Sequence, residues 1–166
     1  MVTLSAERMR AHVNLTEHNH RVTSDECDEY NCIAWAFGIN DAQLWPGIID
    51  MDWPEGVPIA ESELESFIAL YASIGYEQSE GSDLEDGYEK VAIYGDGEGP
   101  THAALQLASG DWSSKMGMEW EDIAHDTPEA VGGRPGYGRV LQVMRRPRVA
   151  QEASSRDHSP REPRAI

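Results

Sequence analysis

The stretch DECDEYNCIAWAFG, residues 25–38, predicts the central element of the fold. Asn31 is a favourable helix N-cap, and Gly38 suits the left-handed residue that closes a helix. The residues between them, from Cys32 to Phe37, are apolar. A helix that is hydrophobic on nearly every side must be buried. We therefore expect a short buried helix that opens at Cys32 and closes at Gly38.

Outward from this helix, the chain divides into a loop, a second helix and a set of strands. Residues 39–60 are rich in Trp, Pro and Gly, which predicts an ordered loop pinned by Trp45 and Trp53. Residues 61–74 carry the apolar stripe of a surface helix that ends at Gly75. The segments that read as strands are residues 88–94, 101–108, 111–116 and 138–144. This order predicts an α+β fold, with N-terminal helices packed on an antiparallel sheet.

The size and composition are those of one folded domain. A chain of 166 residues with 40% hydrophobic residues can bury a core of its own. We expect an irregular segment at residues 1–24, a single α+β domain at 25–146 and a disordered Arg/Pro/Ser-rich tail at 147–166. No apolar run follows a basic head at the start, and no stretch approaches a membrane span. The expected location is the cytoplasm, without membrane contact.

The charge is unevenly distributed along the chain. The formal net charge is −17, and residues 1–144 hold 27 Asp and Glu against 7 Lys and Arg, whereas residues 145–166 hold 6 Arg against 3 acids. A domain with this much negative charge cannot neutralise phosphates over a continuous surface. Nucleic-acid binding is therefore not expected, unless through the short Arg-rich tail. The acidic surface would suit a basic protein partner. The sequence carries no signature of oligomeric state.

A cysteine and a histidine form the best candidate for chemistry. Cys32 would lie in the first helical turn, where free backbone N–H groups and the helix dipole favour a thiolate. The same N–H groups, with the Asn31 amide, could hold the oxyanion formed when a thiolate attacks an amide carbonyl. His102 follows a turn at residues 97–101 and opens a strand, which suits a base. Cys27 lies among acids that raise a thiol pKa, so we expect it to be structural.

The register of the hairpin that follows His102 decides which polar residues share the face of the histidine. With a two-residue loop at residues 109–110, Ser113 and Lys115 would share the face of His102. With a three-residue loop, Ser114 would take that place. Both registers remain open at the level of the sequence.

Other polar residues offer alternatives to the hairpin. His125 or Asp126, in the loop that we expect to follow, could take that place instead. The competing interpretation of Cys32 is an inert core residue, because a cysteine in an apolar helix behaves as a small hydrophobe. Three histidines near the N-terminus lack regular metal-ligand spacing, so neither a metal nor a cofactor is expected: His12, His18 and His20.

Several motifs resemble those of an uncharacterised bacterial domain family over about residues 20–146. They are YNCIAWA (30–36), THAALQ (101–106), WSSK (112–115), DIAHDT (122–127) and YGRV (137–140). The order of helix-borne cysteine, sheet and strand-leading histidine is also similar, more distantly, to the papain-like superfamily, especially the CHAP-type amidohydrolases and peptidases. The first resemblance implies no activity. The second implies a papain-like core with a third polar residue that orients the histidine, and the candidates for that residue are Ser114, His125 and Asp126.

Two functional hypotheses follow. The first is a papain-like thiol hydrolase or transferase, a cysteine peptidase, amidase or deamidase, that acts on an amide-containing substrate. In it Cys32 attacks, His102 moves the proton, Asn31 helps to hold the oxyanion, and Ser114 or His125 orients the imidazole. The second is a non-catalytic binding, immunity or regulatory protein on the same fold, whose acidic surface recognises a basic partner.

Overall fold

The computed structural model describes residues 1–148, which form one sheet with short helices around it. The helices are α1 (Ala6–Arg10), α2 (Cys32–Phe37), α3 (Glu63–Ala72) and the 3-10 helix η1 (Pro128–Val131). The strands are β1 (His20–Val22), β2 (Glu77–Ser79), β3 (Tyr88–Asp96), β4 (Gly99–Gln106), β5 (Trp112–Lys115), β6 (Asp122–His125) and β7 (Arg139–Pro147). Within residues 1–148, these seven strands pair antiparallel in the order β1-β6-β5-β4-β3-β7-β2. The predicted mixture of helices with an antiparallel sheet is confirmed.

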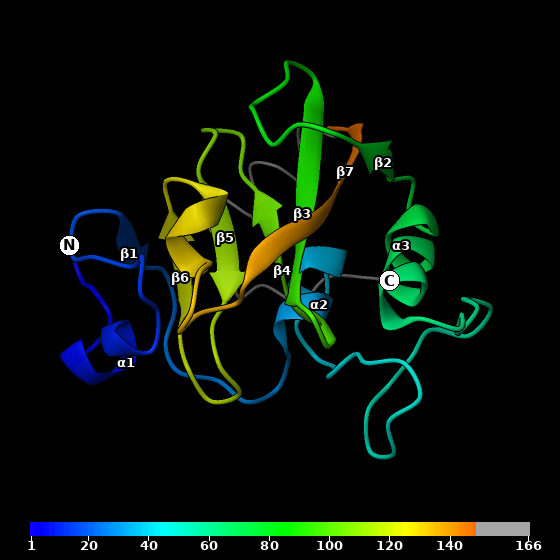
Figure 1. Cartoon of the computed structure of the whole chain (residues 1–166), viewed down its shortest axis with the longest axis horizontal. Coiled ribbons are helices and arrows are strands. Elements are labelled where there is room, and N and C mark those ends of the chain that lie inside the picture. The colour runs from blue at the N-terminus through cyan, green and yellow to red at the C-terminus, as the bar shows by residue number, and fades with distance from the viewer. Residues whose placement is uncertain (149–166) are drawn as a thin grey trace.

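The helix expected from residues 25–38 is α2, with both of its predicted ends. The Asn31 side chain accepts a hydrogen bond from the Ala34 N–H at 3.0 Å, and Gly38 closes the helix at φ 104°. That φ favours glycine, which has no Cβ to clash. The helix packs against β4 and β5, and Figure 1 shows it behind the central strands. The N-terminus of α2 is thereby fixed beside the middle of the sheet.

Trp45 and Trp53 hold the long loop after α2 in place, as expected, and both contact α3. The Trp45 indole donates to a Glu63 carboxylate oxygen at 2.7 Å and packs edge-on against Phe67, with ring centroids 4.9 Å apart. Trp53 packs on the same phenyl ring, at 6.0 Å. α3 is shorter at both ends than predicted and is capped by Ser62, whose hydroxyl accepts from the Glu65 N–H. The loop is therefore ordered by contacts with a helix that follows it.

The two faces of the sheet are both covered. The face that we call the helix face packs against α2 and α3, and it presents Ile93, Ala103 and Leu105. The opposite face, which we call the N-terminal face, packs against the N-terminal segment and η1 and presents Tyr94 and Ala104. Successive side chains of a strand alternate between faces. This alternation decides which polar side chains can meet.

The β4–β5 hairpin has the three-residue loop. The Leu107 N–H donates to the Asp111 carbonyl at 2.7 Å, which leaves residues 108–110 in the loop. This register places Ser114 on the N-terminal face and Lys115 on the helix face. Of the two alternatives open in the sequence, the one with Ser114 is confirmed.

The chain ends of the described region differ from the expectation in small ways. Strand β7 extends to Pro147, past the predicted end at residue 144, and the Arg148 N–H donates to the Gly87 carbonyl at 2.8 Å. The rest of the predicted tail, residues 149–166, lies outside the described residues. Among residues 1–148, no helix has the length and apolar character needed to cross a membrane.

Candidate functional site

A pocket of about 440 Å³ opens at the N-terminal end of α2. Its walls are mostly apolar, and the largest apolar side chains come from the loop after α2 and from the turn after β5. Those side chains are Trp45, Met51 and Met118. The polar side chains that line it include Asn31, Cys32, Thr101, Lys115 and Tyr137. This volume, with apolar walls and a few converging polar groups, is typical of a small-molecule site.

Cys32, the first residue of α2, has its sulfur between that helix and β4. Burial is the strongest influence on the thiol and raises its pKa to about 11. The backbone N–H groups of Ala103 and Ile33, together with the Lys115 ammonium, oppose that rise only in part. At neutral pH Cys32 is therefore a protonated thiol, contrary to the thiolate expected from its place in the helix.

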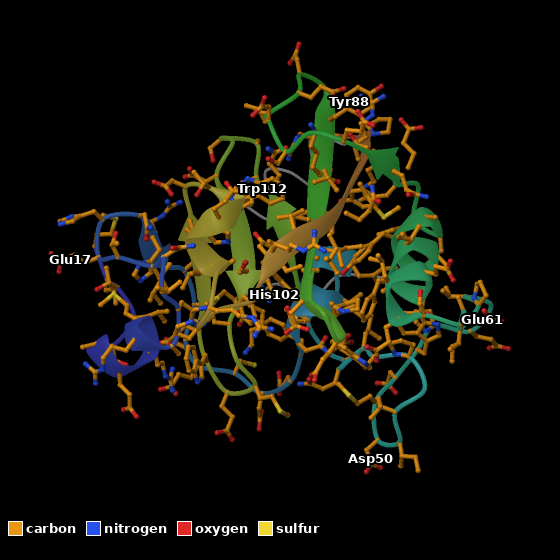
Figure 2. The ribbon with its side chains drawn as sticks, in the orientation of Figure 1. Glu17, Asp50, Glu61, Tyr88, His102 and Trp112 are labelled. Carbon is orange, nitrogen blue, oxygen red and sulfur yellow. The ribbon has the colours of Figure 1, made fainter. Side chains whose placement is uncertain are left out.

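His102 lies on the opposite face of the sheet from Cys32. Ala103, the next residue of β4, packs with α2, so the His102 side chain points to the N-terminal face. Its ring stacks on Tyr137 with centroids 3.8 Å apart and meets Tyr94 edge-on at 5.3 Å. Figure 2 shows the histidine inside the body of the protein. The predicted contact between the Cys32 thiol and the His102 ring is not formed.

Three of the predicted site residues do meet, on the N-terminal face. His102 Nε2 lies 3.0 Å from Ser114 Oγ, which lies 2.8 Å from His125 Nε2. His125 Nδ1 lies 2.7 Å from the Thr127 carbonyl. We call this chain of buried groups, His102, Ser114 and His125, the histidine relay. Ser114 thus contacts both imidazoles, but on the face of the sheet away from Cys32, so an orienting role for Ser114 or His125 in catalysis stays a prediction.

The Thr127 carbonyl at one end of the histidine relay determines which relay atoms carry hydrogens. The Thr127 carbonyl can only accept, so His125 Nδ1 carries a hydrogen and its Nε2 accepts from the Ser114 hydroxyl. Ser114 Oγ then accepts from His102 Nε2–H. The His102 Nδ1 is a bare lone pair, and among the described residues it has no hydrogen-bond partner.

Burial keeps both relay histidines neutral. It lowers the pKa of His125 to about 4 and that of His102 well below its ordinary value. The charges of the other histidines add to the effect on each ring. A base for an enzyme that works at neutral pH needs a pKa close to 7. His102 has neither the position nor the basicity predicted for that role.

Lys115 lies on the helix face of the sheet, where the hydrolase hypothesis had placed His102 as the base. Its ammonium is buried and donates to the Met116 and Gly117 carbonyls at 2.8 and 2.6 Å. It also lies 5.7 Å from the centre of the Tyr30 ring. Tyr30 in turn donates its hydroxyl hydrogen to Asp122 at 2.6 Å. The pocket therefore has a buried positive charge beside the thiol.

Tyr137 joins the two faces at the end of the sheet. Its ring stacks on His102 of the histidine relay, and the residue also lines the pocket, where its hydroxyl accepts from the Gly117 N–H at 3.3 Å. Burial, followed by the nearby Cys32, raises the pKa of this hydroxyl. Sequence reasoning missed Tyr137 as a site residue, and the only signal was its presence in the YGRV motif.

The Asn31 side chain, at the edge of the pocket, forms hydrogen bonds through both its amide oxygen and its amide nitrogen. Its Oδ1 accepts from Ala34 and Leu44 N–H groups, and its Nδ2 donates to the Leu44 carbonyl at 2.7 Å. The side chain predicted to hold an oxyanion thus clamps the start of α2 to the loop that follows it. One amide hydrogen of Nδ2 is left over by these bonds.

The fold and the pocket define an α+β domain with a thiol-lined pocket at one end of a twisted antiparallel sheet. Residues 21–145 match the family described as Domain of unknown function (DUF7689), and the chain belongs to this family. The matched range includes every residue that lines the pocket. The membership in an uncharacterised domain family expected from the motifs is confirmed. Comparisons with curated proteins and with solved structures gave no match.

Proposed function

We propose that this domain binds a small ligand in the pocket at the N-terminal end of α2. The observation that carries the proposal is the pocket itself, with a volume of about 440 Å³ and apolar walls above Cys32 and Tyr137. Protein sites for small molecules have this size and this mixture of apolar walls with few polar groups. Of the two hypotheses from the sequence, this proposal follows the binding hypothesis, but it places the binding site in the pocket and not on the acidic surface.

Binding is favoured over catalysis by the positions of the two groups meant to react. The Cys32 thiol, with a pKa of about 11, needs a base to become a nucleophile at neutral pH. The His102 ring faces the other side of the sheet and stacks on Tyr137. A pocket lined by a neutral thiol can bind a ligand without reacting with it.

Two methionines make the proposal testable by NMR. Met51 and Met118 line the pocket, whereas Met144 lies in the core, almost fully buried. With methyl-¹³C-methionine labelling, fragments that enter the pocket should shift the Met51 and Met118 signals and leave Met144 in place. A chemically varied fragment set that moves neither pocket methyl would overturn the proposal.

A second candidate is the thiol hydrolase or transferase with a papain-like core, acting on an amide. One observation favours it. The Ala103 and Ile33 backbone N–H groups converge beside the Cys32 sulfur, where they could stabilise both a thiolate and an oxyanion. In this mechanism the sulfur attacks the carbonyl carbon, and the leaving group departs with the thiol proton, so an acyl group remains on Cys32.

The acyl intermediate offers a direct test of that second candidate. Incubation with an activated ester or thioester should add one acyl mass to the intact protein if Cys32 is a nucleophile. The added mass should be absent from the Cys32→Ala variant and present in Cys27→Ala. An unmodified wild-type protein, or equal modification of both variants, would exclude this mechanism.

A further inference from the structure

Two segments that line the pocket also carry exposed apolar side chains. They belong to the loop after α2 and to the turn between β5 and β6, and Figure 1 shows both at the same end of the sheet. We call residues 45–52 and 117–119 of these segments the pocket mouth. In it Ile49 is 87% exposed, Met118 71% and Ile48 50%. Large apolar side chains that are exposed beside an apolar pocket are typical of an interaction surface.

The pocket mouth is also acidic. Asp50, Asp52 and Glu119 belong to it and are exposed, and Figure 2 shows Asp50 at the tip of its loop. Within residues 1–148, none of these three carboxylates forms an ion pair. Glu63 adds a carboxylate beside the mouth, where it accepts from the Trp45 indole at 2.7 Å. The mouth therefore combines exposed apolar side chains with carboxylates that pair with no described cation.

The negative charge extends along the part of the chain that surrounds α2. Residues 22–89 hold 17 Asp and Glu and no Lys or Arg. This segment includes α2, the loop after it and α3. Lys115 also lines the pocket, but it is buried, and its ammonium donates to the Met116 and Gly117 carbonyls. The exposed charge at the mouth is therefore negative, which attracts a cationic partner and repels an anionic one.

We infer that a cationic polypeptide docks on the pocket mouth and inserts one apolar side chain between Trp45, Met51 and Met118. Lys or Arg side chains on either side of this anchor pair with the exposed carboxylates of the mouth. The inference rests on the proposed binding function and names its partner. An apolar anchor in a pocket, with charged groups around it, is the usual anatomy of a protein interface. A ligand confined to the pocket would leave Ile48 and Ile49 in water, because neither residue lines it.

Peptides of equal length, blocked at both ends, separate the anchor from the charge. They are Lys-Lys-Phe-Lys-Lys, Gln-Gln-Phe-Gln-Gln, Glu-Glu-Phe-Glu-Glu and Lys-Lys-Ala-Lys-Lys. Each is titrated into methyl-¹³C-methionine-labelled protein, and the Met51 and Met118 signals give its dissociation constant. The Lys peptide with Phe should bind most tightly, the Gln peptide about tenfold more weakly and the Glu peptide more weakly still. Replacing Phe by Ala should weaken binding by about tenfold or more, because the buried ring is lost.

Two double variants with the same change in net charge locate the surface. Asp50→Asn with Glu119→Gln neutralises the mouth, and Asn suits the positive φ of 72° at residue 50. Glu80→Gln with Asp83→Asn neutralises two exposed acids before β3, and Figure 2 shows Tyr88, where β3 begins, far from Asp50. The mouth variant should weaken Lys-Lys-Phe-Lys-Lys by about three- to tenfold, the value of two exposed ion pairs. The control should weaken it by less than about twofold, because salt screens distant charges.

Each outcome bears on one part of the inference. Equal affinities of the Lys, Gln and Glu peptides, or equal losses in the two double variants, would overturn the cationic partner while the Met51 and Met118 shifts still supported a binding pocket. Equal affinities of the Phe and Ala peptides would overturn the apolar anchor. If no peptide moved the two methyl signals but fragments did, the polypeptide partner would be wrong and the binding function would stand. Loss of every shift, for the peptides and for the fragment set, would overturn the binding function itself.

Discussion

The Cys32 thiol should react slowly at neutral pH, although it lies at a helix N-terminus. Burial raises its pKa from 9.0 to about 11. Since only the thiolate attacks, this rise lowers the reactive fraction about 100-fold below pH 9. Thiolates of higher pKa are better nucleophiles, with a Brønsted slope of about 0.4–0.5, which restores about eightfold. The net expectation is exchange with a disulfide about tenfold slower than that of an exposed cysteine.

The assay is exchange with a neutral pyridyl disulfide, on a Cys27→Ser variant so that one thiol is measured. From about pH 6 to about pH 9 the logarithm of the rate should rise by about one for each pH unit, without a plateau. The same protein in denaturant gives the reference rate for an unshielded thiol. Lys115→Met should slow the reaction further, because the ammonium lowers the thiol pKa.

His102→Ala is the decisive comparison. Its ring lies on the other face of the sheet, so the Cys32 rate profile should keep its shape and position in this variant. A rate that stays high below pH 7 in the wild type and falls in His102→Ala would show a thiolate–imidazolium pair. That result would refute the assignment of the two side chains to opposite faces and restore the hydrolase mechanism.

Three further predictions concern stability. Because burial lowers the His125 pKa from 6.5 to about 4, the free energy of unfolding should be highest above pH 6.5 and fall by about 3 kcal/mol as the pH drops to 4. Urea unfolding at each pH measures this change, and a free energy that stays constant between those pH values would contradict the prediction. Ser114→Ala leaves two buried imidazole nitrogens without a hydrogen-bond partner and should lower the free energy of unfolding by about 2–4 kcal/mol at pH 7. The control Ser109→Ala, in the exposed hairpin loop, should lower it by less than about 1 kcal/mol. Asn31→Ala removes the α2 cap and two loop bonds and should cost about 2–3 kcal/mol in the same assay, whereas an unchanged midpoint would show that water replaces all three.

The elements that could be predicted are those whose signals are local. The cap, apolar run and closing glycine of α2 all lie within eight consecutive residues, 31–38. The four predicted strands contain enough apolar or β-branched residues to be recognised. The strands β1, β2 and β6 have three or four residues each, and β1 and β2 are edge strands with polar side chains. Their pairing comes from tertiary contacts that periodicity does not report.

The sequence indicated the polar residues around α2 and β4, but not which face of the sheet each of them occupies. The hypothesis placed His102 over the helix because it gave no weight to the alternation along β4. Ala103, Leu105 and Leu107 are apolar, whereas His102 and Gln106 are polar and share the other face. A buried helix such as α2 packs on the apolar set, so this alternation was a signal for the correct face. Tyr137 had no comparable signal, because a loop brings it to the pocket over a long sequence separation.

The histidine relay affects the pocket through Tyr137, although it does not act on Cys32. Each internal link of the relay is a hydrogen bond between buried neutral groups, which holds the His102 ring in one orientation. Tyr137 stacks flat on that ring, with an interplanar angle of 1°, so the position of its hydroxyl depends on the relay. The lowered pKa values keep both relay histidines uncharged at neutral pH. Tyr137 should therefore keep its position beside the pocket across the neutral range and lose it only on acidification, when a charged His125 no longer accepts from Ser114.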